Sequence, residues 1–310
     1  MEMNINRNLH QNKNEILRYL RDRAAESYSE IITIHGERDY KKKAGAINKA
    51  IVNTAQNLRT IIIQRSLSQS WDKEEILNNI LMVTYCSYVT MIEYRNKAWP
   101  YEYMAFARRI GELWEPFCKN CFDFPVRGDV ELFEPPLFSD VKEQLQEEIR
   151  QYIENLNLSV EEKVQLLEYY DKVWSLVTSG EIKLELDLHF RINSSQYNVD
   201  FKSGFQSNEK GNTNRLLLVA SIYKNIIGGN NECFLFVRAN EDQNNHYLQT
   251  LKNSGIWDVY CGPETYEQIN KYSGFDLASW IKNNIFWKEN LDRDTQSYFE
   301  SNDLVKYLSW

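Results

Sequence analysis

The chain has 310 residues, of which 43% are hydrophobic and 26% charged, the composition of an ordinary globular protein that can bury a sizeable core. Its formal net charge of −8 excludes a basic protein that coats nucleic acid, although a DNA enzyme needs only a local cluster of Lys and Arg. We expect a cytoplasmic protein without membrane contact, because the sequence shows no membrane-spanning apolar run, no signal peptide and no disulfide framework among its five cysteines.

Helical spacing dominates the first part of the chain. Apolar residues recur there every three to four positions, and Pro100 suits the start of a helix. The predicted helices cover residues 12–29, 43–66, 71–93 and 101–120. We therefore expect an all-α N-terminal region over residues 1–125.

Cys118 and Cys121 form a C-x-x-C pair near the end of the fourth predicted helix. The pair is explained either by a zinc site or by two half-buried cysteines at a helix end. The second explanation is preferred, because no second cysteine pair lies nearby to complete a tetrahedral ligand set.

Composition changes over residues 123–137, where prolines and a glycine interrupt helix formation and mark a domain boundary after residue 125. Two further helices are expected beyond it, over 140–156 and 160–178. Each begins with a pattern that resembles a capping box, and a glycine follows the second. The residues concerned are Asp140 with Glu143, Ser159 with Glu162, and Gly180.

The period of the apolar residues then changes from helical spacing to strict alternation. Apolar and polar residues alternate over 182–192, the segment 193–196 has turn chemistry, and alternation resumes over 197–202. This pattern predicts a β-hairpin with one face in the core and the other in water. The polar face would carry Glu185, Asp187, His189 and Arg191 on one strand and Asn198, Asp200 and Lys202 on the other.

The rest of the chain continues as a mixture of helices and strands. A polar loop over 203–212 leads to a helix over 214–227, which Gly228 and Gly229 end. The later elements are strands over 232–238 and 256–261 and helices over 263–271, 275–285 and 293–308. We expect an α/β (α+β) region, a mixed sheet flanked by helices, over residues 126–310.

The charged face of the hairpin is the most informative feature of the sequence. Asp187 is expected about one rung from Asp200 on the same face, with Lys202 two residues further along. Two bare carboxylates about 4 Å apart repel by roughly 4 kcal/mol at an effective dielectric near 20, so they need a compensating cation. Mg²⁺ meets this need, since it binds one or two carboxylates together with water and phosphate oxygens. Lys202 adds a positive charge that suits phosphodiester hydrolysis.

At these residues the chain resembles the PD-(D/E)XK nucleases, and type II restriction endonucleases in particular. Asp187 and the triplet Asp200-Phe201-Lys202 fit the D…(D/E)-x-K core, and the resemblance covers roughly residues 160–262. Leu186 stands where the family has its proline, and the second acid is Asp rather than Glu. The resemblance implies a restriction-endonuclease-like fold, Mg²⁺-dependent cleavage of double-stranded DNA at a specific sequence, and Asp187, Asp200 and Lys202 as catalytic residues.

The resemblance also sets expectations for the whole chain and leaves alternatives open. Residues 126–310 would be the nuclease domain, residues 1–125 would contact DNA or dimerise, and the enzyme would be a homodimer on two-fold symmetric sites. A related nuclease in repair or phage defence, or a non-catalytic DNA-binding protein of this fold, are alternatives. Glu185 competes with Asp187 as the first acid, and Glu168 is a candidate further metal ligand. A bland, salt-bridged hairpin is the remaining explanation of the pattern.

Two groups of residues are candidates for contact with DNA. The loop after the hairpin supplies Ser203, Ser207, Asn208, Lys210, Asn212, Asn214 and Arg215, and Asn212 or Thr213 is expected to cap the next helix. The second group is Lys41, Lys42 and Lys43, followed by Lys49, Arg59 and Arg65 on one predicted helix. A solvated helix face is the alternative for this second group. His189 and Arg191 are expected to be surface residues near the hairpin tip.

Overall fold

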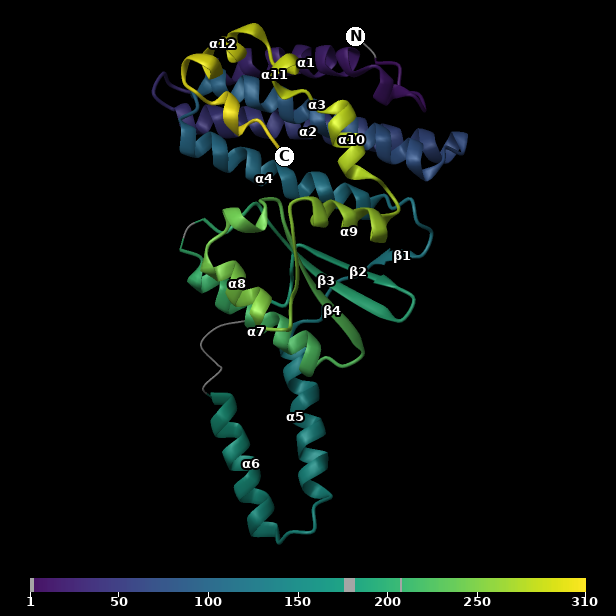
Figure 1. Cartoon of the computed structure of the whole chain (residues 1–310), viewed down its shortest axis with the longest axis vertical. Helices are drawn as coiled ribbons and strands as arrows, with labels where there is room; N and C mark the ends of the chain where they lie inside the picture. The colour runs from purple at the N-terminus through teal and green to yellow at the C-terminus, as the bar shows by residue number, and fades with distance from the viewer. Residues whose placement is uncertain (1–2, 176–181, 207) are drawn as a thin grey trace. The chain divides into compact units, whose positions relative to one another are not determined.

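The computed structural model describes residues 3–175, 182–206 and 208–310. These residues form twelve α-helices and a five-stranded mixed sheet, so the chain is a mainly helical α/β protein. They divide into two compact units, which we call unit 1 (Met1–Val130 with Gly262–Trp310) and unit 2 (Glu131–Cys261). Figure 1 labels most elements of both.

Unit 1 begins with the four helices that the sequence predicts. They are α1 (Lys13–Ile34), α2 (Tyr40–Gln69), α3 (Lys73–Ala98) and α4 (Tyr103–Asp123), preceded by a 3₁₀ turn, η1 (Leu9–Gln11). Helix α3 begins with a capping box between Asp72 and Glu75, and it is buried on every side from Asn79 to Asn96. None of the described helices is both long enough and apolar enough to span a membrane.

The C-terminal helices belong to unit 1, although the sequence grouped residues 126–310 together. They are α9 (Pro263–Ser273), α10 (Leu277–Asn284), α11 (Trp287–Asn290) and α12 (Arg293–Ser301), followed by η3 (Val305–Tyr307). Trp310 explains the difference: its ring lies 4.8 Å from Phe117 of α4 and 5.1 Å from Trp287. Hydrophobic periodicity predicted α9, α10 and α12, missed the four-residue α11, and contained no information about this aromatic packing.

Unit 2 contains the sheet, in the order β1-β2-β3-β4-β5. The strands are β1 (Val130–Leu132), β2 (Leu188–Ile192), β3 (Ser195–Lys202), β4 (Asn230–Val237) and β5 (Asp258–Cys261). β2 and β3 are antiparallel, which confirms the predicted hairpin, although its first strand begins at Leu188 and not at residue 182. β4 is parallel to β3 and β5 is parallel to β4. The parallel pairs are connected through α7 (Lys210–Asn225) and through η2 (Glu241–Gln243) with α8 (His246–Asn253).

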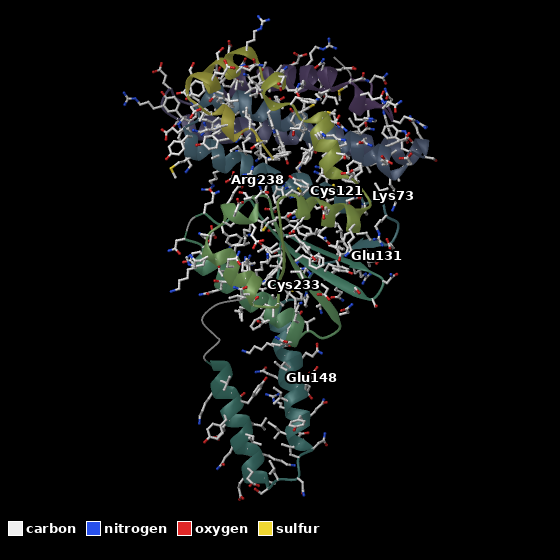
Figure 2. All side chains as sticks on the ribbon, viewed as in Figure 1. Lys73, Cys121, Glu131, Glu148, Cys233 and Arg238 are labelled. Atoms are coloured by element: carbon white, nitrogen blue, oxygen red, sulfur yellow. The ribbon has the colours of Figure 1, made fainter. Side chains whose placement is uncertain are left out.

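The face predicted to be in water is buried at His189, Asn198 and Asp200, although Arg191 near the tip is exposed, so the prediction of a solvated polar face was wrong for most of that face. One face carries a row of aromatic rings, with Phe190 and Tyr197 stacked at 4.8 Å. On the other face, Asn198 and Asp200 are neighbours of Cys233 and Leu235 of β4, which pack in one core with buried residues of α7 and α8. Cys233 marks this core in Figure 2. Alternation identified the two faces but could not show that α7 would cover the polar one.

A helical hairpin precedes β2 in the chain. It consists of α5 (Phe138–Glu154), which carries Glu148 of Figure 2, and α6 (Val160–Ser175), and the two helices lie side by side in Figure 1. The capping box between Ser159 and Glu162 is present, with Ser159 N–H donating to Glu162 over 2.8 Å. The predicted box at Asp140 was wrong, because α5 already begins at Phe138. Gly180 lies outside the described residues.

Candidate active site

The hairpin register brings Asp187 and Asp200 together. Leu188 is paired with Val199, so one further step places Asp187 opposite Asp200. The turn is two residues long, and Asn193 adopts a left-handed φ of 55° that asparagine tolerates better than most residues. The Asp187 carboxylate accepts a hydrogen bond from the backbone N–H of Phe201 over 2.7 Å. This bond fixes the first acid beside the second.

Asp200 is fully buried and is paired with two cations. Lys202 Nζ donates to Asp200 Oδ1, and Arg215 Nη2 donates to Asp200 Oδ2 over 3.2 Å. Lys202 also donates to the carbonyl of Phe201 over 3.1 Å. Burial raises the pKa of the Asp200 carboxyl, and the nearby Asp187 carboxylate adds to this, although Lys202 and Arg215 favour the ionised form.

The site lies where open α/β sheets commonly bind ligands. Asp200 and Lys202 are among the last three residues of β3, whose neighbour β4 is parallel to it. Ligands of such sheets bind beyond the carboxyl ends of the strands. The Lys202 side chain is 21% exposed, so its charge can reach a bound anion.

The oxygens gathered here suit a hard divalent cation. The carboxylates of Asp187 and Asp200 are adjacent, and the Phe201 carbonyl is within hydrogen-bonding distance of the same Lys202. In the part of the chain that the structure describes, no three His, Cys, Asp or Glu side chains gather as a metal site. Mg²⁺ does not require such a cage, because it keeps waters and takes substrate oxygens as ligands.

His189 supports the first acid, and the expectation that it lies at the surface was wrong. Its side chain is buried, and its Nε2 accepts the backbone N–H of Leu186 over 2.9 Å. Nδ1 lies 2.9 Å from Asn198 Oδ1, so the proton is on Nδ1. His189 thereby holds the segment that carries Asp187. His189 and Asn198 face each other in the hairpin, and this polar pair is the signal in the sequence from which the supporting role could have been inferred.

The other candidate acids lie apart from this pairing. Glu185 is exposed in the extended segment before β2, and Glu168 is exposed on α6. Arg191 is exposed as expected and forms an ion pair with Glu131 at 2.7 Å. The structure therefore brings Asp187, Asp200 and Lys202 together and leaves Glu185 and Glu168 outside the group.

Among the described residues of the loop and of the start of α7, Arg215 is the one DNA-contact candidate that donates a hydrogen bond to the carboxylates. Exposed or half-exposed positions on the loop and the first turns of α7 are occupied by Ser203, Asn208, Lys210, Asn212 and Asn214. Ser207 lies outside the described residues. The predicted cap was wrong, because α7 begins at Lys210 after Glu209, which places Asn212 and Thr213 inside the helix.

The lysine cluster lies at the start of α2 in unit 1. Lys41 and Lys42 are exposed, and Lys42 forms an ion pair with Asp39 at 3.5 Å. Lys43 donates to the Glu37 carbonyl over 3.1 Å.

Two arginines further along α2 are less available to a ligand. Arg65 donates to the carbonyl of Ile5, and Arg59 is partly buried against Phe124, where burial lowers the pKa of its guanidinium. The exposed basic surface here is therefore smaller than the sequence indicated. Cys118 and Cys121 are fully buried in α4, more deeply than the expected half-buried positions.

Comparisons of the chain with protein-family models, with curated proteins and with solved structures gave no match.

Proposed function

We propose that the chain is a Mg²⁺-dependent endonuclease of the PD-(D/E)XK type that cuts double-stranded DNA at specific sequences, as type II restriction enzymes do. The observation that carries this proposal is the adjacency of Asp187, Asp200 and Lys202 at the carboxyl end of β3. Two adjacent carboxylates repel each other and need a compensating cation. Hydrolysis of a phosphodiester bond is promoted by a divalent cation, and a lysine beside it can stabilise charge on the phosphate.

The residues have separate roles in this proposal. Asp187 and Asp200 would hold Mg²⁺, which supplies charge neutralisation at the scissile phosphate and makes water a better nucleophile. The Phe201 N–H keeps the Asp187 carboxylate in place. Lys202 donates to the Phe201 carbonyl and to the Asp200 carboxylate, and from this position its ammonium can orient the attacking water or offset charge on the phosphate.

The topology of unit 2 supports a restriction-endonuclease-like fold. An antiparallel hairpin, a helix and a strand parallel to the hairpin's second strand follow one another as β2, β3, α7 and β4. This is the mixed sheet with flanking helices that the resemblance implied. We further propose that the enzyme acts as a homodimer, because a two-fold symmetric protein matches a two-fold symmetric DNA site.

The proposal is tested by incubating the protein with phage DNA in Mg²⁺, with and without EDTA. Discrete fragments that form only in the absence of the chelator support a sequence-specific nuclease. A continuous smear in Mg²⁺ would favour a related nuclease without sequence specificity. DNA that stays intact in Mg²⁺, or that is cut equally in EDTA, would refute the proposal.

A further inference from the structure

Arg215 differs from the other charged residues of the site because it comes from a helix rather than from the hairpin. It lies one turn into α7, and the buried residues Leu216 and Val219 anchor that helix on the sheet. Its guanidinium reaches Asp200 Oδ2, yet its side chain remains 41% exposed. One end of this group therefore pairs with the buried acid while the side chain still reaches solvent.

Both oxygens of Asp200 are already bonded to cationic side chains. Lys202 donates to Oδ1 and Arg215 to Oδ2. Each oxygen still has a second lone pair, but two positive side chains beside the carboxylate repel a divalent cation, so cation binding at Asp200 favours the departure of one of them. Lys202 is held by two acceptors, Asp200 and the Phe201 carbonyl. Arg215 is held less firmly, because Asp200 is its one ion-pair partner among the described residues. Arg215 is thus the cation that is released more easily.

We propose that Arg215 forms a phosphate-binding subsite that exchanges its ion pair with Asp200 for an oxygen of the scissile phosphate when a divalent cation binds. This inference rests on the proposed nuclease function and adds a coupling between cation and DNA. A guanidinium has five N–H donors in a planar fork that matches phosphate oxygens. Because Arg215 is half-exposed, it can turn toward a phosphate while α7 stays in place.

The exchange makes two binding events depend on one another. Without DNA, the Arg215 guanidinium competes with the cation for Asp200 and weakens cation binding. With DNA present, the phosphate takes over the guanidinium, so cation and DNA strengthen each other's binding by the same factor. A guanidinium that only neutralised Asp200 would give no such reciprocity.

The experiment compares Arg215→Met and Arg215→Lys with Lys224→Met, which removes a cation from the other end of α7, where Lys224 pairs with Glu232 at 3.5 Å. Mg²⁺ affinity is measured by calorimetry without DNA. DNA affinity in Mg²⁺ is measured by stopped-flow fluorescence anisotropy before cleavage begins, so that Lys202 is kept in every protein. Circular dichroism and Tm establish that each variant is folded.

Arg215→Met should bind Mg²⁺ several-fold more tightly than wild type in the absence of DNA. In Mg²⁺ it should bind DNA about tenfold more weakly, with a salt slope lower by about one. Arg215→Lys should lie between the two, because lysine keeps the charge but not the fork, and Lys224→Met should match wild type. Unchanged or weaker Mg²⁺ binding by Arg215→Met, or unchanged DNA binding, overturns the inference.

The outcome also separates this inference from the proposed function. If wild type binds Mg²⁺ and cuts DNA while the Arg215 variants behave like wild type, the nuclease proposal stands and the inference fails. If wild type neither binds Mg²⁺ nor cuts DNA, both fail. If Arg215→Met does not fold, Arg215→Lys decides the question, because its ammonium can still pair with Asp200.

Discussion

The carboxylate of Asp187 accepts the backbone N–H of Phe201 over 2.7 Å. This bond joins the residue just before β2 to the residue that separates Asp200 from Lys202. It is not part of the regular pairing of the hairpin, which begins at Leu188 and Val199. The Asp187 side chain therefore accepts the N–H that a backbone carbonyl would accept in a longer strand pair, and this holds Asp187 beside Asp200.

The burial of Asp200 predicts a conflict between stability and function. The pKa of Asp200 in the folded protein is raised above the 3.8 of the unfolded chain. At pH values between these two pKa values, the folded state therefore binds more protons than the unfolded chain. Wild-type stability should thus fall as pH rises through this range. Asp200→Asn should abolish cleavage yet raise the Tm at pH 7, because a neutral amide removes the cost of burying a charge.

The pH dependence supplies the control for this prediction. The Tm difference between Asp200→Asn and wild type should shrink as the pH falls below 3.8, where the carboxyl is protonated in the unfolded chain as well as in the folded one. A variant that is less stable than wild type at pH 7 would show that pairing with Lys202 and Arg215 outweighs the cost of burial.

Lys202 is predicted to act on the reaction more than on binding. Lys202→Met should slow single-turnover cleavage about a hundredfold or more, because the ammonium no longer stabilises charge at the phosphate. DNA affinity, measured by anisotropy, should change little. Lys183→Met removes a comparable charge from an exposed position before β2 and should cut at the wild-type rate. Equal rates for the two variants would exclude Lys202 from the reaction.

His189 is predicted to position Asp187 through the Leu186 backbone. His189→Ala removes the acceptor of the Leu186 N–H and should lower the cleavage rate by about 10- to 100-fold, as the loss of an outer partner of a metal ligand does. His189→Gln should recover part of the rate, since its amide can both donate and accept. Arg191→Ala, two residues away on the same strand, is the matched control and should be neutral. An equal loss for His189→Gln and His189→Ala would contradict a role through hydrogen bonding.

The lysine cluster at the start of α2 is predicted to hold the DNA backbone. Replacing Lys41, Lys42 and Lys43 with Ala should weaken binding to every sequence alike and flatten the salt dependence. Lys282, Lys288 and Lys306 are exposed lysines elsewhere in unit 1, and their triple Ala variant is the control for charge. The same affinity and salt slope in both triple variants would identify the cluster as a solvated surface.

The hairpin and its acids could be predicted because period-two alternation and turn residues are local signals. The turn was predicted over residues 193–196, with Asp187 about one rung from Asp200, whereas the observed turn is two residues long and places Asp187 opposite Asp200. These features depend on residues that are close together in the chain.

The features that sequence reasoning missed depend on distant residues. Burial of Asp200 and His189 requires α7 to cover the polar face, and Arg215 reaches Asp200 only because that helix returns over the sheet. Strand β1 is three residues long and α8 eight, so both are too short to give a clear period. The grouping of residues 262–310 with the N-terminal helices depends on aromatic contacts such as that of Trp310 with Phe117.

The central claim is that Asp187, and not Glu185 two residues before it, is the first acid of a nuclease site. It is tested most directly by the rate of Mg²⁺-dependent DNA cleavage for Asp187→Ala and Glu185→Ala, two folded variants that each remove one carboxylate. We predict that Asp187→Ala is inactive, because the cation loses a ligand beside Asp200, whereas Glu185→Ala cuts at close to the wild-type rate. Cleavage by Asp187→Ala at the wild-type rate would contradict the account and leave the hairpin as an ordinary salt-bridged element.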